Sequence, residues 1–588
     1  MLHRLARATA PVALLLAISA AAPPIGAAAA SPPLRAVAVA SAVSYSAGLQ
    51  GTDHSDSLMA IDCPAVGECT AVGSVKDAAG NSQATTIDQV DGTWGTAQAI
   101  DLGGHAPGYY GELSAISCTA VRTCTAAGVI SDSDGNALAA VVSEVDGVWG
   151  PVVTLTFADG SQNTPPSSWL SSISCTAADA CSVAGSFWNA EGNYESIVAD
   201  EVAGTWGPAT PLRFPDGVRY PQPNDGLNQI ACSTPGNCTA VGAFRDAGYG
   251  QEAMAVSETD GVWGMVVPAA FPDGVQSDHG DSFASVSCTS AGNCTAAGFY
   301  MYPTYQQAAM VATQTDGVWA PVVTIALPAS LQSDSNYAGL ESISCTSPGS
   351  CSAVGMAMDA NHDNVGLIVT ETAGSWGEAQ PVTFAPGIHA ASSSSDELTS
   401  VSCSGEGDCT AGGRYADAGG FAGAMLVTET NGTWGDAQPV VYAKGMRTSA
   451  FRAIWAVSCA SPGVCGAAGA FGDRHYQAMA VTFFSWAPAP SLSPLIGTGH
   501  EDLGPVIHWY APATLVGPVR SYVVTAKDDD TAAVDTCHAT GSGRKCRLLH
   551  LAQGHGYTIS VAAKEVVGKG RHAVVVLTAD SDSYGLSW

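Results

Sequence analysis

Residues 113–128 read LSAISCTAVRTCTAAG, and the same pattern occurs eight times along a chain of 588 residues. Each copy has two cysteines separated by five residues, an Ile or Val two residues before the first cysteine, and a glycine four residues after the second. The first cysteines of successive copies lie 55–58 residues apart. Self-similarity at a nearly fixed period is typical of repeat architectures, so each copy predicts one structural unit.

All eighteen cysteines belong to close pairs, eight within the repeats and one near the C-terminus. An even number of evenly spaced cysteines in an exported chain is typical of a disulfide framework. Zinc is the alternative, but two cysteines five residues apart without flanking histidines do not have a usual zinc spacing. The expected disulfides are Cys63–Cys69, Cys118–Cys124, Cys175–Cys181, Cys232–Cys238, Cys288–Cys294, Cys345–Cys351, Cys403–Cys409, Cys459–Cys465 and Cys537–Cys546.

Each repeat predicts four strands. The first ends at one cysteine and the second begins at the other, because a pair at the mouth of a hairpin has the short separation that a disulfide needs. The third ends at a D-G, N-G or A-G pair such as Asp146-Gly147, which favours a two-residue turn with positive φ. The repeat's invariant glycine is expected to permit the close approach of a neighbouring sheet. A fourth strand starts at a recurring tryptophan: Trp94, Trp149, Trp206, Trp263, Trp319, Trp376 or Trp434.

Four antiparallel strands repeated eight times, with no helical periodicity, predict an all-β fold with an eight-bladed β-propeller over residues 31–486. The eighth repeat has a third strand at 477–484 but lacks the turn and the tryptophan of a fourth strand. Residues 37–45 have strand-like composition and precede the first repeat. We expect this N-terminal segment to complete the last blade and close the ring, which would remove exposed edges. An open solenoid of the same repeats is the alternative.

The N-terminus predicts export. His3, Arg4 and Arg7 precede an apolar run, and an A-x-A site ends at Ala30, so residues 1–30 have the pattern of a secretory signal peptide. The apolar run is too short for a membrane span. The formal net charge of −31 makes nucleic acid and anionic membrane poor partners. We expect a secreted, extracellular protein, most simply a monomer.

After a Pro/Ser-rich linker at 487–498, the repeat stops. Residues 499–588 resemble a fibronectin type III module: Trp509 lies on the second predicted strand, Ser521–Val524 reads S-Y-V-V, and an L-x-x-G-x-x-Y-x-I-x-V-x-A pattern starts at Leu551. Glu565 stands where that family usually has Asn. The resemblance implies a small β-sandwich that acts as a spacer or adhesive unit without catalysis of its own.

The repeats resemble the C-x5-C…G-x-W repeats of poorly characterised secreted actinobacterial proteins. Their turn before the tryptophan also resembles the Asp-box of sialidase-type propellers, although the S-x-D-x-G-x-T-W pattern is not intact. Neither resemblance supplies an activity.

A catalytic set is not evident from the sequence. Carboxylates recur five residues before the tryptophans, as Glu144, Glu201, Glu258, Glu371 and Glu429, with Gln89 and Gln314 in two other repeats. A single catalytic pair needs two differently tuned carboxylates in one place, so we interpret the repeated position as a turn-facing hydrogen-bond acceptor. The arginines of the repeats occupy unrelated positions and are interpreted as surface residues: Arg122, Arg213, Arg219, Arg245, Arg414, Arg447, Arg452 and Arg474.

No cofactor is expected. Calcium is the alternative, because Asp132-Ser133-Asp134-Gly135-Asn136 has oxygen ligands at alternating positions, although the later bidentate Glu of a calcium loop is absent.

The loops of a propeller open on two faces. The hairpins that join strands one to two and three to four are uniform here, whereas the two-to-three loops and the connectors between blades vary and carry aromatic residues. Variable aromatic loops on a rigid scaffold suit sugar stacking or protein contact, while covering of the blade ends is the plainer alternative. The candidate binding residues are Tyr109, Tyr110, Trp169, Trp188, Tyr194, Tyr220, Tyr249, Tyr302, Tyr305, Tyr337, Tyr415 and Tyr476.

We therefore expect a binding or adhesion protein whose partner is a polysaccharide or an extracellular protein. The alternative is a secreted glycan-active enzyme of the glycosidase type, with a site in the propeller centre assembled from distant loops.

Overall fold

The computed structural model describes residues 37–46, 49, 56–102, 110–158, 160–272, 280–332, 337–384, 388, 396–417, 421–442, 451–472 and 477–484 of the repeat region. Beyond it, residues 506–508, 519–528, 531, 533–540, 543, 545–548, 556–567, 574–577 and 584–587 are described. The expected signal peptide and linker lie outside the described residues.

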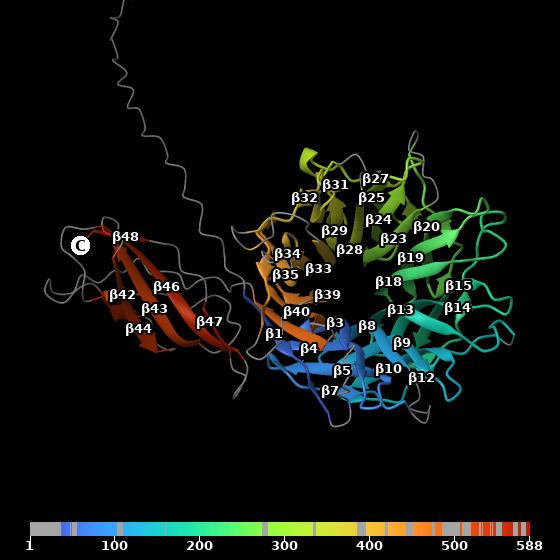
Figure 1. Ribbon diagram of the computed structural model, residues 1–588, viewed down its shortest axis with the longest axis horizontal. Helices are drawn as coiled ribbons and strands as arrows, with labels where there is room; N and C mark the ends of the chain where they lie inside the picture. Colours follow the sequence, from blue (N-terminus) through green and yellow to red (C-terminus); the bar gives the residue numbers. More distant parts are fainter. Residues whose placement is uncertain are drawn as a thin grey trace, which may run out of the picture. The chain divides into compact units, whose positions relative to one another are not determined.

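The repeats form eight antiparallel blades around a common axis (Figure 1). The innermost strands are β3 Ser57–Ala65, β8 Gly111–Ala120, β13 Ser168–Ala177, β18 Gly226–Thr234, β23 Ser282–Ser290, β28 Ala338–Ser347, β33 Glu397–Gly405 and β39 Phe451–Ser461. The second strands are β4 Glu68–Lys76, β9 Thr123–Ser131, β14 Ala180–Trp188, β19 Asn237–Arg245, β24 Asn293–Met301, β29 Ser350–Met358, β34 Asp408–Ala416 and β40 Val464–Gly472. The third strands are β5 Ser82–Val90, β10 Ala137–Val145, β15 Tyr194–Val202, β20 Gln251–Thr259, β25 Gln307–Thr315, β30 Asn364–Thr372, β35 Ala422–Thr430 and β41 Gln477–Phe484. The all-β propeller predicted from the repeats is thereby confirmed.

The fourth strand of blades one to seven consists of two short pieces that pair with the third strand, where the sequence suggested one continuous strand. In blade two the amide of Gly150, which follows the tryptophan, donates to Ser143 O, and Pro151 then has no N–H to offer. The pieces are β6 Thr93–Trp94 with β7 Thr96–Ala99, β11 Val148–Trp149 with β12 Val153–Thr154, β16 Thr205–Trp206 with β17 Thr210–Pro211, β21 Val262–Trp263 with β22 Val267–Pro268, β26 Val318–Trp319 with β27 Val323–Thr324, β31 Ser375–Trp376 with β32 Gln380–Pro381, and β36 Thr433–Trp434 with β37 Gln438–Pro439.

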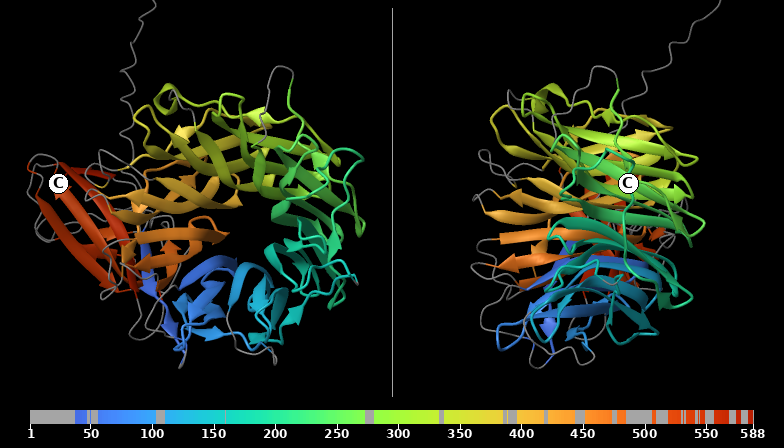
Figure 2. Two further views of the ribbon diagram at one scale, coloured as in Figure 1. Left: turned by 45° about the vertical axis from the view of Figure 1, so that its right-hand side comes forward. Right: turned by 90° about the vertical axis from the view of Figure 1, so that its right-hand side faces the viewer.

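The ring closes between the last repeat and the N-terminal segment. Strand β1 (Val37–Ala42) pairs antiparallel with β41 and supplies the fourth strand of blade eight. On the other side of the junction, β3 contacts β39 and β40. Two short strands, β2 (Ser44–Tyr45) and β38 (Val441–Tyr442), add to β7 and β1 in parallel. Because the first and last repeats touch, the open solenoid is wrong, and Figure 2 shows the closed ring.

All nine expected disulfides are present, with no free cysteine among the described residues. In the repeats each joins directly opposed residues of the first hairpin; Cys118 and Cys124, for example, have Cα atoms 3.9 Å apart. The D-G turns also behave as predicted, because Asp146 and Gly147 have φ of 50° and 81°. Blades one to seven are therefore fixed at both hairpins, and blade eight at its first hairpin.

The invariant glycine serves its own blade, not a neighbouring sheet as the sequence suggested. A Cβ at Gly128 would lie 2.0 Å from the carbonyl oxygen of Glu112 and 2.8 Å from the Cα of Leu113, both on β8 of the same blade. The register of β8 and β9 shifts at this point, between Leu113 and Ala115. The bulge presses the inner strand onto β9, and only a residue without a side chain fits there.

The hydrophobic core lies between blades. One cluster combines Val141 and Leu155 of blade two with Leu170, Val183 and Phe187 of blade three. The same arrangement crosses the closing junction, where a cluster joins residues of blade one to Ala468 and Ala480 of blade eight. Each blade therefore buries its apolar side chains only when its neighbours are in place.

A ring of hydrogen bonds joins the inner strands around the axis. The residue before the first cysteine of one blade accepts a bond, 2.7–3.1 Å long, from the backbone amide of the first cysteine of the next blade. This bond forms at seven of the eight junctions, with Ser458, Asp62, Ser117, Ser174, Ser287, Ser344 and Ser402 as acceptors. At the remaining junction the acceptor position is Ala231, whose methyl group cannot accept a hydrogen bond from Cys288.

The C-terminal part is described by itself. Strands β43 (Val519–Asp528), β44 (Val534–Thr540), β46 (Gly556–Val567), β47 (Val574–Leu577) and β48 (Tyr584–Ser587) form one antiparallel sheet, and β42 (Val506–His508) pairs with β45 (Lys545–Arg547). Tyr522, Tyr557 and Ile559 are buried in its core. The fibronectin type III assignment stays a prediction.

The inner ring of hydrogen bonds can be tested with two opposite substitutions. Ser402→Ala removes the acceptor for Cys459 N–H and should lower the free energy of unfolding by about 1–2 kcal/mol. Ala231→Ser supplies an acceptor at the one junction that lacks it and should raise the free energy by about 0.5–1 kcal/mol. Urea denaturation measures both. A shift of the two variants in the same direction would contradict the role assigned to the ring.

Candidate functional site

The two propeller faces differ as the loop sequences suggested. On the uniform face the two hairpin turns of a blade bond to each other, as when the amide of Gly147 donates to Arg122 O at 3.0 Å. The same glycine-to-turn bond recurs in each of blades one to seven. On the varied face, the two-to-three loops bond to the connectors between blades, as Trp188 N does to Ser167 O at 2.9 Å. The uniform face thus satisfies its own polar groups in the same way in each of those blades.

Three of the predicted aromatic residues meet on the varied face of blade three. Trp169 lies on the inner strand β13, Trp188 ends β14 and Tyr194 begins β15. The rings of Trp169 and Tyr194 are stacked, with centroids 4.7 Å apart. Trp188 packs edge-on against Tyr194 at 6.1 Å and is 40% exposed. The strand ends therefore hold three rings together at the edge of the blade.

A second aromatic pair lies on the same face of blade four. Tyr220, in the connector, packs edge-on against Tyr249, in the two-to-three loop, with ring centroids 5.1 Å apart. The guanidinium of Arg245 lies over the Tyr249 ring, 4.6 Å from its centroid. Tyr249 is nevertheless 63% exposed. An aromatic surface therefore remains open to solvent here too.

Ion pairs connect the two aromatic groups. Arg219, next to Tyr220, reaches the carboxylates of Asp225 and Glu195, the latter at 3.5 Å. Glu195 follows Tyr194 and also accepts a hydrogen bond of 2.8 Å from Asn189 Nδ2. We call the residues Trp169, Trp188, Tyr194, Glu195, Arg219, Tyr220, Asp225, Arg245 and Tyr249 the blade 3–4 patch.

Asp225 is the most buried group of the patch. Desolvation raises the pKa of its carboxyl to about 6, although the charge of Arg219 and a hydrogen bond from it act in the opposite direction. The charge of nearby Glu195 adds to the increase. Arg219 was interpreted from the sequence as a surface residue, but it holds these two carboxylates together.

The other predicted aromatic residues do not join this patch. Tyr110 donates a hydrogen bond of 2.7 Å to Glu112, and Tyr302 receives one of 2.7 Å from Tyr300. Tyr305 is 80% exposed on the loop of blade five, and Tyr337 is partly buried at the start of blade six. Tyr109 and Tyr476 lie outside the described residues.

Tyr415 cannot serve as a stacking surface, because it is buried. It belongs to strand β34, not to the loop after it, and packs against Phe384 with ring centroids 5.4 Å apart. The equivalent positions of three other blades form the same pair, as Phe157–Phe187, Phe214–Phe244 and Phe271–Tyr300 do. The sequence signal for this burial was the recurrence of an apolar residue six positions after the second cysteine.

The repeated carboxylates are buried, and the equivalent Gln89 and Gln314 bond to the glycines of their own turns, as the turn-facing interpretation predicted. Glu144, Glu201, Glu258, Glu371 and Glu429 are at most 8% exposed. Each has at least one carboxyl oxygen without a hydrogen-bond partner in the described structure. Desolvation raises the pKa of every one of them, that of Glu144 and Glu258 to about 7.

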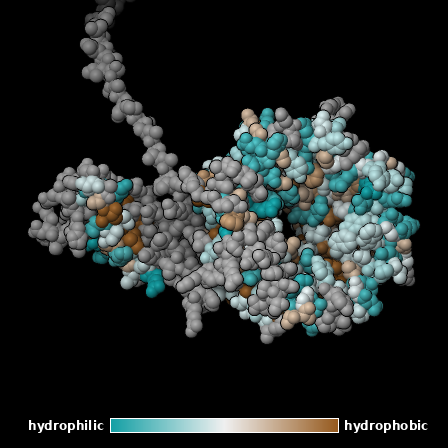
Figure 3. All heavy atoms as spheres, in the orientation of Figure 1, coloured by the Kyte–Doolittle hydropathy of each residue, from teal (hydrophilic) through white to brown (hydrophobic). Residues whose placement is uncertain are grey.

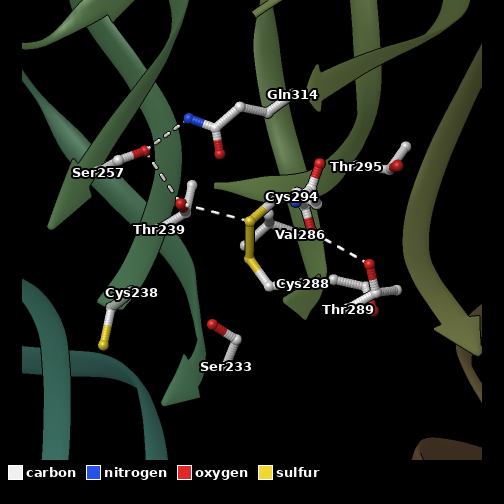
Figure 4. The surroundings of a disulfide bond; sticks show 12 residues. Ser233, Cys238, Thr239, Ser257, Val286, Cys288, Thr289, Cys294, Thr295 and Gln314 are labelled. Carbon is white, nitrogen blue, oxygen red and sulfur yellow. Dashed lines mark hydrogen bonds between the residues drawn. A yellow bond between two sulfur atoms is a disulfide. The ribbon is translucent and has the colours of Figure 1, made fainter. Parts of the chain in front are cut away.

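The two glutamines at this position show which chemistry it requires. Gln314 Nε2 donates to Ser257 Oγ of the preceding blade at 3.0 Å (Figure 4). It also donates to Gly317 O of its own turn at 3.3 Å. Gln89 Nε2 also donates to the carbonyl of its own turn glycine, Gly92. A protonated carboxyl group can donate as an amide does, whereas a carboxylate cannot. For Glu258, whose pKa is raised to about 7, we infer the same donor role. Glu429 instead accepts a hydrogen bond of 3.3 Å from Ser352 Oγ of the preceding blade. The role of the repeated position is structural.

Two further carboxylates lie on adjacent inner strands. Glu341 is on β28 of blade six and Glu397 begins β33 of blade seven. The pKa of the Glu341 carboxyl is raised, mainly by desolvation and also by the charge of Glu397. Part of the Glu341 side chain nevertheless reaches solvent. Arg414 binds Glu397 through Nε at 3.0 Å and a terminal nitrogen at 2.6 Å. One of the two carboxylates is thus paired with a cation.

In the loop considered for calcium, the carboxylate of Asp132 is already hydrogen-bonded within the loop. Oδ1 of Asp132 accepts from the amides of Asp134 and Asn136, each at 2.9 Å, and Oδ2 accepts from Asn136 Nδ2 at 2.7 Å. These hydrogen bonds lower the pKa of Asp132, and the bond from the Asn136 side chain has the largest effect. Among the residues that the structure describes, no group of three or more His, Cys, Asp or Glu could hold a metal ion. The absence of a cofactor stays a prediction, with calcium as its alternative.

The visible propeller face in Figure 3 is mainly hydrophilic, with small and scattered hydrophobic spots. Within the described part of the chain, no helix is long and apolar enough to cross a membrane.

No protein-family model and no curated protein matches the chain. Solved structures to which it is similar include the Hadza microbial sialidase Hz136 (TM-score 0.32, 11% identity, 68% of this chain and 73% of that chain). Others are the Trypanosoma rangeli sialidase in complex with the inhibitor DANA (TM-score 0.33, 10% identity, 82% and 92%) and an ulvan lyase from a new family of polysaccharide lyases (TM-score 0.38, 10% identity, 67% and 95%). At these TM-scores the similarities carry no argument about function.

The neutral-donor interpretation predicts how stability depends on pH. Glu258 has a pKa of about 7 in the folded protein, above its ordinary 4.5, so unfolding releases a proton between these values. The free energy of unfolding should therefore fall as pH rises through that window. Glu258→Gln keeps the donor and cannot ionise beside Asp200, so it should match the parent at about pH 5 and exceed its stability at about pH 8, by on the order of 1 kcal/mol.

Chemical denaturation at the two pH values measures the effect, with the exposed Glu378→Gln as the matched control. Equal stability of parent and Glu258→Gln protein at the higher pH would show that the buried carboxyl does not act as a neutral donor.

Proposed function

We propose that the protein is a secreted binding protein that recognises a polysaccharide through the blade 3–4 patch. The observation that carries the proposal is the cluster of Trp169, Trp188 and Tyr194, which are packed on each other while Trp188 stays exposed. Flat aromatic rings stack on the apolar faces of sugar rings. Because these rings are already held in place, little conformational entropy is lost when a ligand binds.

The position of the cluster supports a binding role over a packing role. Packing needs are common to all blades and are met by residues that recur, such as the tryptophans of the fourth strands. A binding site for one ligand is asymmetric. The Trp169 position is occupied in other blades by Ser57, Glu112, Gly226 and Gly339, so no shared packing need selects a tryptophan there.

Secretion is part of the proposal. Nine disulfides would be reduced in the cytoplasm and persist in an oxidising extracellular environment. A rigid, cross-linked propeller would keep the loops of the varied face in place there.

A glycosidase is the second candidate, favoured by Glu341 and Glu397. An enzyme that cleaves glycosidic bonds needs one protonated and one ionised carboxyl group near each other. Glu341 has a raised pKa, and Glu397 is paired with the cation of Arg414, which suits the acid and the ionised partner respectively. The enzyme alternative requires that Glu341→Gln abolish release of reducing ends from a polysaccharide that the protein binds. Binding without any such release favours the first candidate.

The binding role predicts separate effects for exposed and packing aromatics. Trp188→Ala should weaken polysaccharide binding about fivefold to tenfold, because a stacking contact of about 1 kcal/mol is lost, and should leave the melting temperature nearly unchanged. Trp263→Ala should instead lower the free energy of unfolding by about 3 kcal/mol, since it opens a cavity and removes the bond of 2.9 Å from its Nε1 to Asp200.

Tyr305→Ala is the control, because Tyr305 is a more exposed aromatic (80%, against 40% for Trp188) on the varied face of another blade. Affinity electrophoresis and thermal melts of the three variants separate the roles. The assignment fails if Tyr305→Ala weakens binding while Trp188→Ala does not.

A further inference from the structure

The charges within the blade 3–4 patch are largely neutralised by one another. The Arg219 guanidinium is bound by two carboxylates, Asp225 and Glu195, and also lies over the Phe214 ring, 4.6 Å from the centroid. Its side chain is 20% exposed, and that of Asp225 is fully buried. Arg219 Nε has no hydrogen-bond partner among the described residues, but it is buried. Because two carboxylates neutralise the guanidinium, Arg219 does not supply the net positive charge that would attract an anionic ligand.

The second arginine is similarly unsuited to an anion. The guanidinium of Arg245 lies over the Tyr249 ring, and the whole chain has a formal net charge of −31. Polyanions are repelled by such a protein unless a local cluster of free cations overcomes the repulsion. The patch instead offers the exposed rings of Trp188 and Tyr249 and the partly exposed carboxylate of Glu195. Among polysaccharides, an uncharged one fits the charge distribution of the patch.

The patch is also continuous across the blade junction. On the tryptophan side, Asn189 directly follows Trp188 and donates a hydrogen bond to Glu195. Glu195 in turn contacts Arg219. On the tyrosine side, Arg219 forms a β-bridge with Asp246, whose carbonyl accepts the amide of Tyr249 at 3.0 Å. Backbone and ion-pair contacts thus connect the exposed ring of blade three to the exposed ring of blade four.

We propose that the ligand is an uncharged polysaccharide chain that contacts both aromatic groups at once. This inference rests on the proposed function and specifies the ligand of that same site. Sugar units stack on Trp188 and on Tyr249, and the carboxylate of Glu195 between them accepts hydrogen bonds from sugar hydroxyls. Because the two contacts lie on one chain, the second forms at high effective concentration once the first has formed.

The experiment titrates the full-length mature protein with soluble neutral polymers, namely a mixed-linkage β-glucan, a galactomannan and a xylan, and with the anionic polymers alginate and polygalacturonate. At least one neutral polymer should bind, at least tenfold more tightly than either polyanion, and raising the salt concentration from about 0.05 to about 0.5 M should change its affinity less than twofold. Screening weakens charge-dependent binding over this range.

Substitutions test the two-group contact. Trp188→Ala and Tyr249→Ala should each lower affinity for the long neutral polymer by about tenfold, because either loss removes the bivalent contact. The double variant keeps neither exposed ring and should bind more weakly than either single variant. For a short oligosaccharide of the same sugar, the Tyr249→Ala effect should fall below twofold.

The outcomes separate this inference from the proposal on which it rests. Tighter, salt-sensitive binding of a polyanion would overturn the uncharged ligand and leave polysaccharide binding intact. Equal Tyr249→Ala effects on long and short ligands would overturn the bivalent contact. Absence of binding to every polymer would overturn the proposed function as well.

Discussion

The propeller depends on one hydrogen bond repeated around its axis, in which the residue before a blade's first cysteine accepts the amide of the next blade's first cysteine. A serine or aspartate is long enough to reach across and small enough to fit between inner strands. A second set of bonds repeats this pattern two residues earlier in part of the ring, as when Ser400 accepts the amide of Val457 at 3.0 Å. Disulfides fix each hairpin, and these bonds fix one hairpin against the next.

This arrangement separates structural from functional positions. The uniform face, the inner ring and the buried Glu or Gln side chains between blades recur because each junction presents similar polar groups to be satisfied. The loops of the varied face are anchored at both ends by strands of the blade, so their sequences can change without loss of the fold. The blade 3–4 patch lies where this freedom places aromatic rings and paired charges on adjacent blades.

The sequence predicted the blades because their determinants are local: a hairpin disulfide, a turn with positive φ and a tryptophan at a fixed offset. It predicted the aromatic face but not the patch, because the contact of Arg219 with Glu195 and Asp225 joins two repeats. The sequence placed Tyr415 in the loop between the second and third strands, because loop-type residues follow it closely. Its repeat offset, filled by Phe244, Tyr300 and Phe471 elsewhere, already indicated burial. Six of the eight repeats have Ser directly before the first cysteine. The sequence did not predict the inner ring from this, because each of its bonds joins two repeats.

The central claim is that ligand binding belongs to the varied face of blades three and four, while the uniform face serves the fold alone. Hydrogen–deuterium exchange of the mature protein with and without a neutral polysaccharide tests this claim directly. We expect slower exchange in the loops around 161–169, 188–195, 219–226 and 245–251, and no change in the turns that contain Gly147, Gly204 and Gly261. Protection confined to those turns, or spread equally over all eight blades, would contradict the account.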